Sequence, residues 1–141
     1  MLKQDIQEHP FFNAGATGRL HDEYDKYGKL IIGFDFDNTI FDYHNCGGDF
    51  RSIILLLQEC KTLGFTLYLF TADSDPEKLK WKTDFCKHYG IEPEYINESP
   101  VLKENKKPYF NILLDDRAGL ESAYCILKTV VLYASSKSNK H

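Results

Sequence analysis

The feature of this sequence that most constrains its fold is a short apolar run that ends in a cluster of acidic residues. The run is Leu30-Ile31-Ile32-Gly33-Phe34, and Asp35-Phe36-Asp37-Asn38-Thr39 follows it directly. An apolar run of this length is typical of a strand buried in a parallel sheet. We therefore expect a buried strand here, which places its acidic residues at one edge of the sheet.

Strands and helices are expected to alternate after this first strand. Further strands are expected at residues 65–70, 94–96 and 110–114, with a fifth at 129–133. Helices are expected at about 52–63, 76–88 and 118–128. Asp49 or Ser52 would cap the first of these helices, and Asp75-Pro76 would begin the second. The alternation predicts an α/β fold: a single Rossmann-like three-layer domain with a parallel sheet of about five strands, covered by helices on both faces.

The length of 141 residues corresponds to one domain. The hydrophobic fraction of 43% is that of a globular chain and is sufficient for one core. We expect an N-terminal arm over residues 1–28, with short helices at Leu2–Glu8 and Arg19–Tyr27. The α/β domain would occupy residues 29–134, and residues 135–141 would form a flexible tail.

Charge and cysteine content argue against several classes of protein. The chain has 17 Lys and Arg against 21 Asp and Glu, a net charge of −4, which disfavours a broad basic surface for nucleic acid. The longest apolar run, Ile53–Leu57, is too short to span a membrane, and the N-terminus lacks the apolar stretch of a secretory signal. The four cysteines form no CxxC pair, so we expect reduced thiols in a cytoplasmic protein.

Acidic and hydroxyl residues follow several of the expected strands. Because ligands bind at the carboxyl ends of the strands in such sheets, these residues are expected to converge at one edge. They are Asp35, Asp37, Thr71, Asp115 and Asp116, with Lys107 just before the fourth strand. Clustered carboxylates resist shared ionisation, and a divalent cation relieves that repulsion. The pattern predicts a Mg²⁺ site, since magnesium favours carboxylate oxygens together with waters and a substrate phosphate.

The ordered set of strand-end residues resembles the motifs of the haloacid dehalogenase (HAD) superfamily of aspartate-nucleophile phosphotransferases. The segment 33–39 resembles its first motif, Leu69-Phe70-Thr71 the second, Lys107 the third and the segment 112–116 the fourth. The resemblance covers about residues 29–133. The stretch from Lys107 to Ala118 is also similar to small capless members of the superfamily.

The resemblance implies a phosphatase that works through an aspartyl phosphate. Asp35 would be the nucleophile that attacks phosphorus. Asp37 would protonate the leaving alkoxide and later activate water. Dehalogenase and phosphonatase branches lack an acid two residues after the nucleophile, so Asp37 points to a phosphomonoesterase or phosphotransferase.

The remaining motif residues would bind the metal and the phosphoryl group. Magnesium would be held by Asp35, by the main-chain carbonyl of Asp37 and by Asp116, with Asp115 acting mainly through a metal-bound water. Thr71 and Lys107 would hold the phosphoryl oxygens and offset charge in the transition state.

No separate lid domain is expected over the site. From Thr39 to Thr71 is 32 positions and from Thr71 to Lys107 is 36, and predicted helices and strands already fill both intervals. An open site favours bulky phosphorylated substrates, so the candidates are a nucleotide, a nucleic-acid end or a phosphoprotein. The loop at residues 41–49, the arm at residues 1–28 or a second subunit would then cover the site; the sequence leaves the oligomeric state open.

Simpler interpretations of the individual residues remain open. Asp35 and Asp37 could be ordinary turn caps, and Thr71 could be a strand terminus. Lys106 is an alternative to Lys107 as the phosphate-binding lysine. His44 lies near the expected entrance, where a solvated loop histidine is the simpler interpretation.

Two non-enzymatic functions also remain open: a HAD-fold binding module and a phospho-acceptor receiver-like domain. Receiver domains carry their acidic pair after the first strand and a lone acceptor aspartate after the third. Here the adjacent pair, Asp115-Asp116, follows a late strand, and the first strand carries Asp35 and Asp37. This order favours the HAD interpretation.

Overall fold

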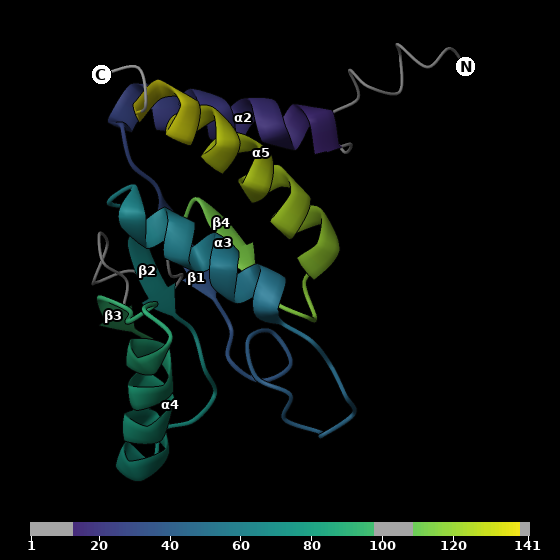
Figure 1. The fold of residues 1–141 in the computed structure, drawn as a ribbon, viewed down its shortest axis with the longest axis vertical. Coiled ribbons are helices and arrows are strands. Elements are labelled where there is room, and N and C mark those ends of the chain that lie inside the picture. Colours follow the sequence, from purple (N-terminus) through teal and green to yellow (C-terminus); the bar gives the residue numbers. More distant parts are fainter. Residues whose placement is uncertain (1–12, 98–108, 139–141) are drawn as a thin grey trace.

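The computed structural model of the chain describes residues 13–97 and 109–138. Its centre is a four-stranded, all-parallel sheet in the order β3-β2-β1-β4. The strands are β1 (Ile31–Phe34), β2 (Thr66–Leu69), β3 (Tyr95–Ile96) and β4 (Ile112–Leu114). The helices are α2 (Asn13–Tyr27), α3 (Arg51–Thr62), α4 (Pro76–His88) and α5 (Leu120–Ser138) (Figure 1). The predicted α/β, Rossmann-like architecture is confirmed.

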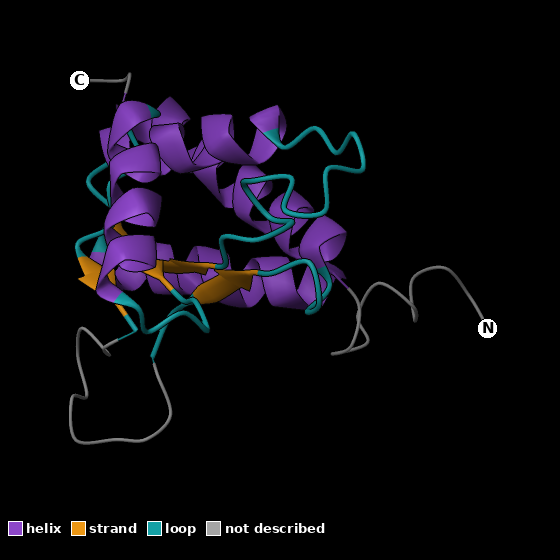
Figure 2. Cartoon of the chain, turned by 90° about the horizontal axis from the view of Figure 1, so that it is seen from below, coloured by secondary structure: helices purple, strands orange, loops and turns teal. Residues whose placement is uncertain are grey.

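One face of the sheet carries the main core. Residues in register across the strands, such as Ile32 opposite Leu67 and Phe34 opposite Leu69, point to the same face because side chains alternate along a strand. They form one apolar cluster with buried side chains of α3, α4 and α5. Figure 2 shows the sheet nearly edge-on, with most of the helices on one side of it. Burial of these strands explains why their sequences are short continuous apolar runs.

The opposite face of the sheet is packed closely against a glycine of β1. A Cβ atom added to Gly33 would lie 3.1 Å from the ring of Phe110 and 3.2 Å from a methyl group of Leu113. Both distances are tighter than ordinary van der Waals contact. The absence of a side chain at Gly33 therefore lets the chain around β4 pack closely on β1, two residues before Asp35.

A local capping signal marks the start of α4 but not the start of α3. Asp75 is the N-cap of α4 and accepts a hydrogen bond from the N–H of Glu77, and Pro76 occupies the first helical position, as predicted. The N-cap of α3 is Phe50, which makes no side-chain capping bond. Asp49, one of the two predicted caps, instead accepts from the N–H and the guanidinium of Arg51.

The predicted fifth strand is wrong, because residues 129–133 lie inside the single long helix α5. The β-branched run Thr129-Val130-Val131 favoured a strand by propensity. The fully buried residues of this region recur at helical spacing, at Leu127, Val130, Val131 and Ala134. Packing of this stripe against α2 and α3 overrides the local preference. The helix continues to Ser138, so residues 135–138 of the expected tail are helical.

The N-terminal helix belongs to the same packed unit. The helix expected at Arg19–Tyr27 begins earlier, at Asn13, and packs along α5. Leu20 is buried, and the ring of Tyr24 contacts Phe65 and Tyr133. The helix expected at Leu2–Glu8 lies outside the described residues. Among the described helices, none combines the length and apolar character needed to cross a membrane.

Candidate functional site

The carboxyl ends of β1 and β4 bring three carboxylates together. Asp35 follows β1, and its N–H donates to the carbonyl of Leu114 at 2.9 Å, which extends the pairing of the two strands by one residue. Asp115 and Asp116 follow β4 directly. One carboxylate oxygen from each of Asp35, Asp115 and Asp116 lies within 4.8 Å of the other two. The predicted convergence of these acids is therefore present.

A tight turn after β1 shapes the floor of the site. The carbonyl of Phe36 accepts hydrogen bonds from the N–H groups of Thr39, Ile40 and Phe41 at 3.3, 3.1 and 3.2 Å. Asn38 adopts a left-handed conformation with φ of 60°, which asparagine tolerates better than most residues. The turn buries the hydroxyl of Thr39, which donates to Asp35 Oδ2 at 3.3 Å. It thereby orients the first acidic side chain.

The electrostatics of the cluster suit a hard cation. The pKa of Asp35 is raised from 3.8 to about 6, first by burial and then by the neighbouring charges of Asp115 and Asp116. A carboxylate in this environment is unfavourable unless positive charge compensates it. Three carboxylate oxygens in a half-buried site match the ligand preference of Mg²⁺, so the donor set fits the metal that the sequence predicts.

Asp37 and Thr71 line the same pocket but do not belong to the three-carboxylate cluster. The pocket has a volume of about 380 Å³. Its lining consists of Asp35, Asp37, Asn38, Tyr43, His44, Phe70, Thr71, Ala72, Asp115, Asp116 and Arg117. The side chain of Asp37 therefore lines the pocket without joining the cluster of three carboxylates.

A loop after the turn forms one wall of the pocket. The carboxylate of Asp42 accepts from the N–H groups of Cys46, Gly47 and Gly48 at 3.1, 2.8 and 3.1 Å and so organises this loop. His44 is exposed, and its Nδ1 is joined to Asn38 Nδ2 at 2.9 Å. His44 therefore lines the pocket, and the exposed ring of Tyr43 lies beside it.

A buried lysine that was not predicted from the sequence lies beneath the site. Lys82 of α4 is 4% exposed, and its ammonium group lies 2.8 Å from Thr71 Oγ1, 2.7 Å from Asp73 Oδ2 and 3.5 Å from Asp37 Oδ2. Asp73, in the loop between β2 and α4, is its ion-pair partner. The signal was present: Lys82 stands three residues after Leu79 and four before Cys86, on the inward face of the helix. Lys107 and its alternative Lys106 lie outside the described residues.

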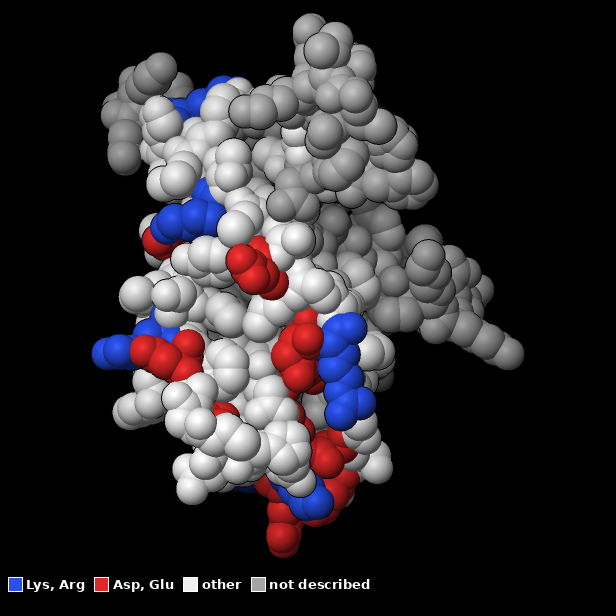
Figure 3. Space-filling view, turned by 90° about the vertical axis from the view of Figure 1, so that its right-hand side faces the viewer, with Lys and Arg blue, Asp and Glu red and all other residues white. Residues whose placement is uncertain are grey.

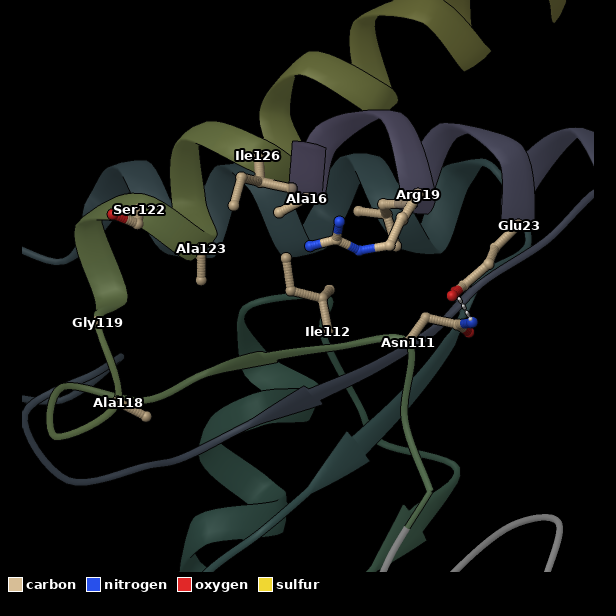
Figure 4. Close-up of a pocket in the computed structure, with 11 residues that line it drawn as sticks. Ala16, Arg19, Glu23, Asn111, Ile112, Ala118, Gly119, Ser122, Ala123 and Ile126 are labelled. Carbon is tan, nitrogen blue, oxygen red and sulfur yellow. Dashed lines mark hydrogen bonds between the residues drawn. The ribbon is translucent and has the colours of Figure 1, made fainter. Parts of the chain in front are cut away.

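A second cavity lies apart from these residues, between α2, α5 and β4 (Figure 4). Its volume is about 410 Å³, and it is lined by small and apolar side chains together with Arg19, Glu23 and Asn111. Asn111 Nδ2 donates to Glu23 at 2.5 Å, and Asn111 Oδ1 accepts from the N–H of Ile31. These bonds tie α2 to the start of β1, so we assign this cavity to the packing of the helices rather than to catalysis.

The residues that the structure describes form no broad basic surface on the face shown in Figure 3. Lys and Arg side chains on that face are separated and lie beside Asp and Glu side chains. Exposed ion pairs occur among the described residues, such as Arg51 with Asp49 at 2.6 Å. This distribution agrees with the net charge of −4.

Fold and site together define an α/β domain with an acidic cluster at the carboxyl edge of a parallel sheet. No family model matches the chain, and no curated protein matches it. A solved structure, that of a conserved protein from Bacteroides thetaiotaomicron, is similar with a TM-score of 0.57 and 22% sequence identity. The match covers 72% of this chain and 91% of that chain. At this identity the likeness shows a shared fold.

Proposed function

We propose that the protein is a Mg²⁺-dependent phosphomonoesterase of the HAD type that acts through an aspartyl phosphate. The observation that carries the proposal is the meeting of Asp35, Asp115 and Asp116 at the carboxyl ends of adjacent strands, each with a carboxylate oxygen within 4.8 Å of the others. The strand order and the position of Asp37 two residues after Asp35 support it. Asp35, Asp115 and Asp116 would hold Mg²⁺, which when bound neutralises their charge and that of the phosphoryl group.

The chain's own residues supply the remaining chemistry. A carboxylate oxygen of Asp35 forms a bond to phosphorus as the bond to the ester oxygen breaks, and the leaving oxygen takes a proton from the carboxyl group of Asp37. In the second half, Asp37 as carboxylate accepts a proton from water. The water oxygen bonds to phosphorus, the bond to Asp35 breaks, and inorganic phosphate leaves. Thr71 donates a hydrogen bond to the phosphoryl group in both halves.

The aromatic side chains that line the pocket indicate the kind of substrate that it binds. Tyr43 and Phe70 present exposed rings to the same pocket as the acidic cluster, and Arg117 also lines this pocket. We place a phosphorylated nucleotide, nucleic-acid end or phosphoprotein there, because an aromatic wall can stack on a base or a tyrosyl ring. The cysteines of the described residues are all unpaired, which supports a cytoplasmic protein with reduced thiols.

Hydrolysis of p-nitrophenyl phosphate with and without Mg²⁺ tests the proposal, followed by a panel of nucleotides, oligonucleotide ends and phosphopeptides. We expect Mg²⁺-dependent release of phosphate that is absent in Asp35→Asn. Beryllofluoride should bind the wild-type protein in the presence of Mg²⁺ and should not bind that variant. Ligand binding without turnover of any member of the panel would instead indicate a binding module. A long-lived phosphorylated Asp after treatment with acetyl phosphate would indicate a receiver-like domain.

A further inference from the structure

Lys82 is the buried charge that the mechanism above leaves unused. Its side chain is 5% exposed, although lysine is among the residues least often buried. Burying an ammonium group is costly unless carboxylates and hydrogen bonds compensate it. The compensating groups of Lys82 come from the loop after β2 and from the turn after β1, which are the two segments that carry Thr71 and Asp37.

The three protons of the ammonium group can all be placed. They face Asp73 Oδ2 at 2.7 Å, Thr71 Oγ1 at 2.8 Å and, more loosely, Asp37 Oδ2 at 3.5 Å. The ring of Phe36 lies 5.0 Å away and covers the cation on a further side. Lysine has three donors and no acceptor, so this set uses its whole hydrogen-bonding capacity.

The hydrogen bond from Lys82 determines what the Thr71 hydroxyl can do. A hydroxyl oxygen has two lone pairs and one proton. At Thr71 one lone pair accepts from Lys82 at 2.8 Å, and the other faces the N–H of Asp73 at 3.4 Å. The remaining capacity of the hydroxyl is its own proton. Thr71 lines the pocket with Asp35, so that proton is available to an acceptor in the pocket.

We propose that Lys82 is a positioning residue of the site: it makes the Thr71 hydroxyl a donor toward the phosphoryl group and holds the Asp37 carboxylate beside it. This inference rests on the proposed phosphatase function and adds to it a residue that contacts neither the acidic cluster nor the substrate directly. The competing explanation is purely structural, namely that the Lys82–Asp73 ion pair only fastens α4 to the loop after β2.

The variants that separate the two explanations are Lys82→Met, Asp73→Asn, Thr71→Val and the Lys82→Met/Thr71→Val double variant. Methionine keeps most of the buried aliphatic stem and removes the charge. The matched control is Lys80→Met on the same helix, whose ammonium group forms an exposed pair with Asp84. Two quantities are measured for each variant: the affinity for inorganic phosphate in the presence of Mg²⁺, by calorimetry, and kcat/KM for p-nitrophenyl phosphate.

A positioning role predicts non-additive losses. We expect Thr71→Val to lower kcat/KM by about 10²-fold, the scale of one lost transition-state donor, and Lys82→Met to lower it by roughly tenfold or more. Phosphate affinity should fall in both variants. The double variant should lose little more than Thr71→Val alone, because the lysine acts largely through that hydroxyl. Lys82→Arg should recover part of the loss, and Lys80→Met should resemble the wild type.

Two results would overturn the inference. If the losses in kcat/KM of Lys82→Met and Thr71→Val multiply in the double variant, Lys82 does not act through Thr71. The ion pair is purely structural if Asp73→Asn reproduces the whole effect of Lys82→Met and if, across the variants, phosphate affinity falls only in proportion to the loss in melting temperature. Both results require an active wild-type protein, whereas a wild-type protein that neither turns over phosphomonoesters nor binds phosphate refutes the proposed function itself.

Discussion

Thr39 and Asp116, which are 77 residues apart in the chain, are joined by a hydrogen bond of 3.1 Å from the N–H of Asp116 to the hydroxyl oxygen of Thr39. The same hydroxyl donates to Asp35 at 3.3 Å. One fully buried oxygen therefore couples the turn after β1 to the turn after β4 and orients the two segments that supply the acidic cluster.

Thr39→Val should loosen this coupling. Valine has nearly the shape of threonine, so the main change is an unsatisfied N–H at Asp116 and a lost hydrogen bond to Asp35. We expect a loss of about 1–3 kcal/mol in the free energy of unfolding, measured in urea, and weaker Mg²⁺ binding. Thr39→Ser keeps the hydroxyl and serves as the control. Equal Mg²⁺ affinity in the Thr39→Val variant and the wild-type protein would contradict the role assigned to this oxygen.

Asp35→Asn should abolish turnover while the fold is retained. The amide has the shape of the carboxyl group, but it is a poor nucleophile for phosphorus. We expect no measurable hydrolysis of p-nitrophenyl phosphate and an unchanged circular dichroism spectrum. Residual activity near the wild-type level would show that another group attacks phosphorus.

In the metal-free protein, the contribution of Asp35 to stability should fall as the pH rises from about 4 to 6. The pKa of Asp35 is about 6 in the folded protein, against 3.8 as the ordinary value. The folded state therefore holds this proton more tightly than the unfolded state. The resulting stabilisation is complete below pH 3.8 and disappears as the pH passes about 6.

Urea unfolding in EDTA across this pH range measures that effect, with Asp35→Asn as the comparison. Because Asp35 is only partly buried and solvent screens its charge, we predict only the direction of the slope. The difference in unfolding free energy between the variant and the wild type should move in favour of the variant as the pH rises. A difference that stays constant from pH 4 to 6 would refute the prediction.

Removal of the metal should abolish activity, and Mg²⁺ should restore it. Calcium should support turnover poorly, because it prefers more ligands in a looser geometry. Mg²⁺ should also raise the melting temperature, since it binds the folded state alone. The rise should be much smaller in Asp116→Asn, which removes one of the three clustered carboxylates. Activity that survives thorough chelation would exclude a metal-dependent mechanism.

The four cysteines should divide into two reactive and two inert thiols. Cys46 and Cys125 are exposed, whereas burial raises the pKa of Cys60 and of Cys86 to about 12. We expect iodoacetamide at pH 8 to modify two sites in the native protein and four in urea, counted by mass spectrometry. Modification of Cys60 without denaturant would contradict the packing of α3 against the sheet.

Much of the fold could be predicted from the sequence, because the signals are local. The apolar runs that became β1 and β2 are buried strands, and the Asp75-Pro76 start of α4 is a capping signal complete within three residues. Strand-end placement of Asp35, Asp115 and Asp116 follows from the same runs, so their convergence could be expected once a parallel sheet was inferred. Their roles as nucleophile and metal ligands remain predictions.

Other features depend on contacts between distant segments, which no local pattern encodes. Residues 129–133 have strand propensity, yet they are helical because Leu127, Val130, Val131 and Ala134 pack as one stripe against α2 and α3. Lys82 appears in the sequence as one lysine among several on α4, and only the folded chain surrounds it with Thr71, Asp73 and Asp37. The sequence by itself determined which residues lie at the strand ends, since apolar runs and caps act over a few residues. Tertiary structure decided which hydrogen bonds and ion pairs these residues make. A hydrogen bond such as that between Thr39 and Asp116 forms only after the sheet brings the two turns together.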